Sequence, residues 1–247
     1  MLSIVASQAD LPNDHFVRKE RLPGQDNLSW LQSVPSLAEH VELLLLGGSG
    51  PGDFRLRIAQ AHARHDLSPS HWSHIALLEP RQSSIASTGV VEVSLEPLHG
   101  FGFPPRANAL QRAELERYAD PRRHPNIALV QVPCQWAAIQ LQLERLSKQR
   151  SAVDLPELVV AWLAFIWGVG KTGNPLLEGR GVPSAVLIET VLGAVGLDLS
   201  PGSVERASCP ELVWQAAKWW QEFYAATDKS LSGAYFTPHE LVEMGAG

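Results

Sequence analysis

The sequence predicts an α+β fold, in which strands and helices are mixed along the chain without strict alternation. Short apolar runs bounded by glycine, proline and serine have the length of strands, and longer segments repeat apolar residues at helical spacing. With 247 residues, of which 45% are hydrophobic and 19% charged, the chain can bury a sizeable core and has an ordinary globular composition.

The first part of the chain, residues 1–38, is expected to be an irregular N-terminal arm. Prolines and a glycine interrupt it, and one short helix is expected around Leu28–Leu31. Residues 39–247 are expected to form one domain that ends in a C-terminal helical extension. No internal repeat divides this domain.

The domain is expected to begin with a buried strand. Val41–Leu46 is a compact apolar run that ends in the glycine-rich turn Gly47–Gly52, and Asp53 stands where an N-cap or first-turn acid would. A helix over Phe54–Arg64 follows. The next two expected strands are Ser73–Leu78 and Val90–Leu95; the second alternates in polarity, so one of its faces should be wet.

The rest of the domain is expected to be mostly helical. Helix Leu155–Trp167 is apolar nearly all round and should be buried, and helix Ser184–Val195 has a proline at its start and a glycine after its end. The other expected elements are a polar helix Arg106–Tyr118, a strand Ile127–Val132, an amphipathic helix Trp136–Leu146, a last helix Cys209–Tyr224 and a short terminal turn from Phe236.

Composition excludes several classes of protein. The net charge of -6 argues against a nucleic-acid partner, because phosphate binding needs a basic surface. Cys134 and Cys209 form neither a metal-ligand spacing nor a disulfide framework, which fits a reducing compartment. The most apolar segment, Leu155–Val169, is shorter than the roughly 20 residues of a membrane span. Without a signal peptide, we expect a cytoplasmic protein with no membrane span.

Two motifs that suggest cofactors are set aside. Gly168–Thr172 looks like the end of a phosphate-binding loop, but Phe165 stands where that loop needs its first glycine. Four histidines between His62 and His74 lack the acid–histidine motif of a zinc protease. The sequence therefore predicts neither a cofactor nor a metal.

Cys209 and the tryptophans each allow two interpretations. A cysteine at a helix N-terminus is a nucleophile candidate, because the helix dipole favours its thiolate; a buried structural cysteine is the favoured interpretation.

Trp219 and Trp220 are adjacent and cannot both face one core. One of them either packs beneath the terminal segment or marks an interface, which would imply a protein partner.

Three stretches between about residues 40 and 205 carry a family resemblance. Trp72–Leu78 is a strand with a histidine at its entrance, Val91–Val93 contains an acidic residue, and Pro183–Leu187 starts a helix that leads into Gly196–Gly202. This order resembles the circularly permuted branch of the NlpC/P60 papain-like superfamily. The resemblance implies a small antiparallel sheet packed against helices.

The resemblance also implies roles for individual residues. In this family a cysteine at a helix N-terminus gives its proton to an imidazole, and a third polar group fixes that imidazole. His74 would be the base and Glu92 the orienting group, with Glu96 as its substitute. The nucleophile position falls on Pro183, or on Ser184 if the alignment shifts by one residue. No cysteine stands there.

Three hypotheses about function remain. The first is a degenerate hydrolase without thiol chemistry, used for binding or assembly with a protein partner. The second is a hydrolase or acyltransferase in which Ser184 or Cys209 attacks an amide or ester bond of a small molecule or peptide, with His74 as base. The third is an unrelated α+β fold, in which His74 is a core or edge histidine and Glu92 a solvated strand residue.

Overall fold

The structure, a computed structural model, describes residues 16–96, 108–148, 154–200, 207–224 and 231–238. Its seven strands are β1 (Phe16–Arg18), β2 (His40–Gly47), β3 (His74–Leu78), β4 (Gly89–Glu92), β5 (Gln111–Glu114), β6 (Asn126–Pro133) and β7 (Ser232–Phe236). The α-helices are α1 (Asn27–Gln32), α2 (Pro51–Ala59), α3 (Trp136–Lys148), α4 (Leu155–Ile166), α5 (Pro183–Ala194) and α6 (Pro210–Tyr224). Four 3₁₀ helices are η1 (Ala61–Ala63), η2 (Ile85–Ser87), η3 (Leu115–Tyr118) and η4 (Pro175–Glu178).

The strands form one mixed sheet in the order β1-β7-β6-β2-β3-β4-β5. The α+β class is therefore confirmed, whereas the sheet is larger than the small antiparallel sheet expected, and it is mixed. All neighbours pair antiparallel except β1 and β7, which pair parallel. The sheet is wider than expected because residues near both ends of the described chain add strands beyond β6.

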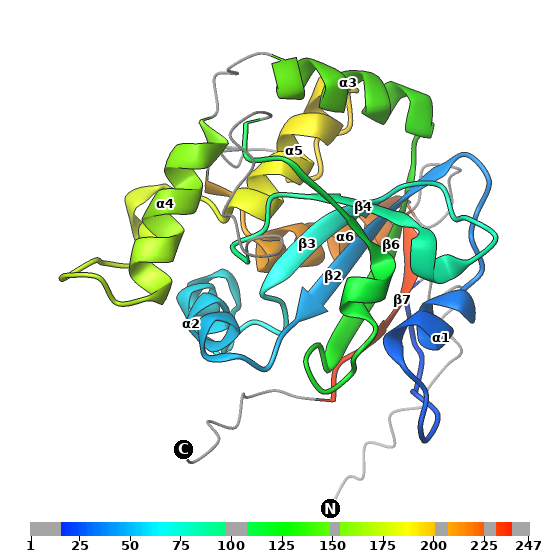
Figure 1. Ribbon diagram of the computed structural model, residues 1–247, viewed down its shortest axis with the longest axis horizontal. Coiled ribbons are helices and arrows are strands. Elements are labelled where there is room, and N and C mark those ends of the chain that lie inside the picture. The colour runs from blue at the N-terminus through cyan, green and yellow to red at the C-terminus, as the bar shows by residue number, and fades with distance from the viewer. Residues whose placement is uncertain (1–15, 97–107, 149–153, 201–206, 225–230, 239–247) are drawn as a thin grey trace, which may run out of the picture.

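Helices cover both faces of the sheet (Figure 1). On β2, Leu43 and Leu45 belong to the core that α3, α4, α5 and α6 close, while Leu44 and Leu46 belong to a second core that α1 closes. Both faces of this strand are buried, which explains why its sequence is a continuous apolar run and does not alternate. The first core is the larger one and includes most of α5.

Three helix and turn predictions need correction. The part of the expected helix Arg106–Tyr118 that the structure describes forms β5 and η3, because hydrogen bonding to β4 takes the place of helical bonds. The terminal turn expected from Phe236 is the end of strand β7. Helix α4 is buried on one face only: Val160 is 67% exposed, and Trp167 after the helix is 71% exposed.

The N-terminal arm is partly regular. Residues 1–15 lie outside the described part, β1 pairs with β7, and α1 confirms the short helix expected around Leu28–Leu31. Gly233 allows this edge to form, since its φ is 154° and a Cβ there would lie 1.9 Å from the Leu129 carbonyl oxygen. Among the described residues, no helix combines the length and the apolar character that crossing a bilayer requires.

Candidate functional site

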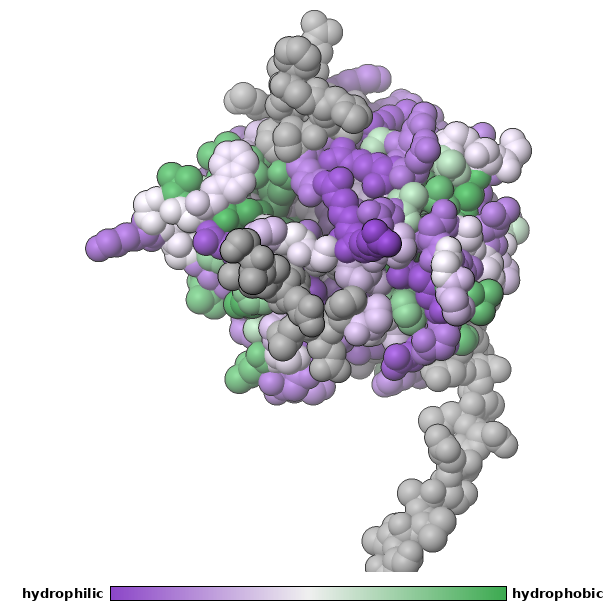
Figure 2. All heavy atoms as spheres, turned by 60° about the horizontal axis from the view of Figure 1, so that its bottom comes forward, coloured by the Kyte–Doolittle hydropathy of each residue, from purple (hydrophilic) through white to green (hydrophobic). Residues whose placement is uncertain are grey.

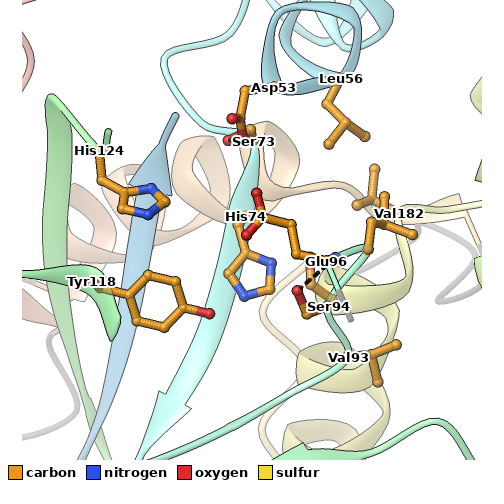
Figure 3. Close-up of a pocket in the computed structure, with 12 residues that line it drawn as sticks. Asp53, Leu56, Ser73, His74, Val93, Ser94, Glu96, Tyr118, His124 and Val182 are labelled. Carbon is orange, nitrogen blue, oxygen red and sulfur yellow. Dashed lines mark hydrogen bonds between the residues drawn. The ribbon is translucent and has the colours of Figure 1, made fainter. Parts of the chain in front are cut away.

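A small pocket lies where β3 begins, between α2, the residues after β4, and the start of α5. Its volume is about 50 Å³. Figure 3 shows the His74 ring at its centre, with the Tyr118 phenol on one side and Ser94 and Glu96 on the other. The lining residues are Asp53, Leu56, Ser73, His74, Val93, Ser94, Leu95, Glu96, Tyr118, His124, Val182 and Ser184.

His74 is held by the carboxylate of Glu92, the last residue of β4. The two residues are joined by a 2.7 Å hydrogen bond between Nε2 and Oε2, and the Tyr118 hydroxyl donates to the same oxygen at 2.5 Å. Glu92 is fully buried. Burial alone would raise the pKa of Glu92, but hydrogen bonding to His74, the charge of that ring and the Tyr118 hydroxyl together hold it below its ordinary value.

This arrangement leaves the second ring nitrogen of His74 available. Its Nδ1 has no hydrogen-bond partner among the described residues, and the side chain is 16% exposed. An ionised carboxylate on one nitrogen favours the tautomer in which that nitrogen carries the proton. Nδ1 can then accept a proton from a group in the pocket.

The start of α2 forms another wall of the pocket. Ser73 donates a 2.5 Å hydrogen bond to the Asp53 carboxylate and accepts one of 3.0 Å from the amide of Gly48. The Gly50 amide donates to the other carboxylate oxygen at 3.2 Å, so Asp53 is the first-turn acid that the sequence predicted. Burial raises the pKa of Asp53 above its ordinary value, against the opposing effect of the Ser73 hydrogen bond.

Ser184 brings an unpaired hydroxyl to the same pocket. It is the second residue of α5 and only 1% exposed, and its Oγ has no hydrogen-bond partner among the described residues. Pro183 occupies the first helical position, and Val182 supplies no side-chain cap. Ser184 and His74 line the pocket together without a hydrogen bond between them, and the space is large enough for one or two waters.

Cys209 is not part of the pocket. It is fully buried just before α6, in an apolar cluster with Leu56, Trp162 and Val182. Burial raises the pKa of its thiol to about 12. The structure thus brings His74, Glu92 and Ser184 to one place and leaves Cys209 outside it.

Two residues of the site carried no sequence signal. Tyr118 was expected within a polar helix, and nothing pointed to His124, whose ring packs edge-on against Tyr118 at 5.2 Å between centroids. Burial, followed by the charge of Arg123, lowers the pKa of His124 to about 4. Across the described residues, no group of three or more histidine, cysteine or acidic side chains is placed to hold a metal ion.

Comparisons with protein-family models, with curated proteins and with solved structures found no match.

Proposed function

We propose that this protein is a permuted papain-like hydrolase or acyltransferase of amide or ester bonds, with His74 as base and Ser184 as nucleophile. The observation that carries the proposal is the unpaired, buried Ser184 hydroxyl in the pocket of a histidine whose far nitrogen is bound to a buried carboxylate. A buried hydroxyl without a partner is costly, so its retention needs a reason.

The chemistry follows from the roles of three side chains. Ser184 Oγ attacks the carbonyl carbon while its proton moves to Nδ1 of His74, and the proton then passes to the leaving group as the ester or amide bond breaks. Water, or another acceptor, releases the acyl group by the same steps in reverse. Glu92 stabilises the imidazolium, and the Tyr118 hydroxyl holds Glu92 in place.

A serine in this position needs more help than a cysteine. Its pKa is far above that of a thiol, so the proton acceptor must be strong when attack occurs. The fully buried Glu92 carboxylate meets this need, because its interaction with an imidazolium is strong where water is excluded. The N-terminus of α5 adds a dipole that favours the developing negative charge.

A binding module that has lost catalysis is the second proposal. Ser184 and His74 share no hydrogen bond, and a pocket of about 50 Å³ is too small for a substrate without rearrangement. Helix α6 offers a surface for a protein partner, where Trp219 and Phe223 stack at 5.0 Å between centroids and are 49% and 65% exposed.

Labelling with a fluorophosphonate separates the two proposals. The full-length chain should gain one adduct by intact mass, and Ser184→Ala should abolish it. Ser94→Ala is the matched control, because Ser94 lines the same pocket but its Oγ already accepts a 3.0 Å hydrogen bond from the Glu96 amide. Unchanged labelling of Ser184→Ala, or no labelling of any folded variant, contradicts the hydrolase proposal.

A further inference from the structure

One carboxylate at the pocket serves neither the His74 pair nor a helix cap. Figure 3 shows the Glu96 side chain turned inward, with its carboxylate between the His74 ring and Asp53. Glu96 follows β4 by four residues and is half-exposed. A second carboxylate so close to the proposed base would oppose the negative charge of a transition state, unless something neutralises it.

Two arginines neutralise Glu96. Arg123 donates from its terminal nitrogen to Oε2, and Arg117 contacts the same oxygen at 3.4 Å and the Glu96 carbonyl oxygen at 3.3 Å. Burial alone would raise the pKa of Glu96, but the guanidiniums of Arg123 and Arg117 hold it below its ordinary value. The two arginines come from η3 and from the turn before β6, so the fold brings them together from separate elements.

The bound carboxylate is replaceable. The Arg123 and Glu96 side chains are 52% and 50% exposed, and ion pairs at that exposure contribute little to stability. An incoming carboxylate or phosphate would find two guanidiniums, the groups best suited to planar, bidentate binding of such anions. The remaining acids of the pocket already have partners: Glu92 is paired with His74, and the Asp53 carboxylate accepts hydrogen bonds from Ser73 and from the Gly50 amide.

We propose that Arg117 and Arg123 form an anion-recognition site, and that Glu96 occupies it as an internal stand-in until an anionic substrate displaces it. The substrate is then an ester or amide whose acyl or leaving part carries a carboxylate or phosphate near the scissile bond. The substrate class rests on the hydrolase function proposed above, whereas the anion site does not. Figure 2 shows hydrophilic residues grouped across the centre of one face of the molecule, with hydrophobic residues gathered toward one side.

Two esters with the same acyl length test the substrate class. 4-Nitrophenyl hemisuccinate and 4-nitrophenyl butyrate differ in their terminal carboxylate, and we expect the wild type to prefer the hemisuccinate in kcat/KM by about tenfold or more. Arg123→Gln should lower that preference about tenfold, and Glu96→Gln should raise it several-fold by freeing the site. Arg122→Gln is the matched control: it removes one exposed charge from the neighbouring residue, and within the described residues no hydrogen bond or ion pair joins the Arg122 side chain to Glu96.

A binding measurement keeps the two proposals distinct. Succinate should raise the melting temperature of the wild type and of Arg122→Gln, and raise it much less in Arg123→Gln and Arg117→Gln. If neither ester is hydrolysed but succinate binding still depends on Arg123, the anion site stands and the hydrolase proposal fails. Hydrolysis with no preference for the charged ester overturns the substrate class. Succinate binding that is equal in Arg123→Gln and Arg122→Gln overturns the anion site.

Discussion

Helices α5 and α6 both begin with a proline, and each carries a side chain of nucleophile type at its start: Ser184 in α5 and Cys209 just before α6. Their surroundings differ. Among the described residues the Ser184 hydroxyl has no hydrogen-bond partner, and it lines a polar pocket, whereas Cys209 is buried in an apolar cluster. The polar groups at the start of α6 are satisfied, since the Glu211 amide donates to Gln60 and the Glu211 carboxylate accepts from Ser70.

The difference shows that a helix N-terminus does not by itself create a nucleophile. The dipole favours an anion at both helix starts by a similar amount, on the order of 1 kcal/mol. Burial without a charged partner outweighs it at Cys209, whose pKa rises to about 12. In the mechanism proposed for Ser184, the decisive group is the His74–Glu92 pair, which β3 and β4 supply.

The largest expected effect comes from removing the charge behind His74. Glu92→Gln keeps the shape but loses the carboxylate that fixes the tautomer and stabilises the imidazolium. We expect kcat for an activated ester to fall on the order of 10²- to 10⁴-fold. Steady-state kinetics on a folded variant, checked by its melting curve, gives the measurement.

Glu114→Gln is the control for that variant, because Glu114 lies exposed on the neighbouring strand β5. It should keep wild-type kcat, and equal rates for the two variants would remove Glu92 from the mechanism.

The pKa of Glu92 is lowered by folding, so its contribution to stability is present above its unfolded pKa near 4.5 and is lost as the pH falls through the folded value. Glu92→Gln should lack this acid dependence.

The next largest effect concerns Cys209. Its pKa near 12, against an ordinary 9.0, lowers the thiolate fraction at neutral pH by about 10³. In a Cys134→Ser background, iodoacetamide should therefore modify the native protein at least about 10³-fold more slowly than the urea-unfolded chain. Intact mass spectra over time measure both rates. Similar rates in the two states would place Cys209 back among the nucleophile candidates.

The fold was largely predictable where burial dictates the sequence. The apolar runs of β2 and β6 and the amphipathic pattern of α3 predicted those elements, because burial selects their residues directly. Strands β5 and β7 were missed, since pairing with β4 and β6 decides their conformation and local propensity does not.

The site was predictable only in part. Glu92 could be proposed because the family resemblance implies an orienting group on the strand after the histidine strand, and the structure places its carboxylate 2.7 Å from the His74 ring. Tyr118 and His124 could not, because they reach the pocket through η3 and the turn before β6, and sequence spacing does not encode that approach. The difference between Ser184 and Cys209 likewise depends on their tertiary surroundings. Both lie at helix starts that contain a proline, so the sequence alone does not distinguish them.

A smaller effect comes from His124, which lines the pocket beside His74 and Ser184 and whose burial there favours the neutral ring. The pKa of His124 in the folded chain is about 4. Between pH 6.5 and 4 this histidine is therefore protonated in the unfolded chain and neutral in the folded chain. Stability should therefore fall by about 3 kcal/mol as the pH drops through that range. The free energy of unfolding, measured in urea, should change less with pH in His124→Gln than in the wild type. The control His62→Gln, at an exposed histidine, should keep the wild-type slope. Equal slopes in all three proteins would mean that folding leaves the pKa of His124 unchanged.

The smallest effect tests whether the start of α6 is sealed by its hydrogen bonds. Gln60 is fully buried; its amide nitrogen donates to the carbonyls of Leu56 and Trp72, and its oxygen accepts from Glu211, each at 2.9 Å. Gln60→Ala leaves the Leu56 and Trp72 carbonyls and the Glu211 amide without this hydrogen-bond partner. The change should lower the free energy of unfolding by about 2 kcal/mol. The exposed Gln82→Ala should cost less than about 0.5 kcal/mol.

Thiol reactivity in the same variant decides how this network relates to Cys209. If the Gln60 bonds hold the start of α6 closed, iodoacetamide should reach Cys209 faster in Gln60→Ala than in Gln82→Ala, each in the Cys134→Ser background. Loss of stability without faster modification would show instead that apolar packing against Leu56 and Trp162 protects the thiol. The contrast between the two helix starts would then rest on packing around Cys209 and on hydrogen bonding around Ser184.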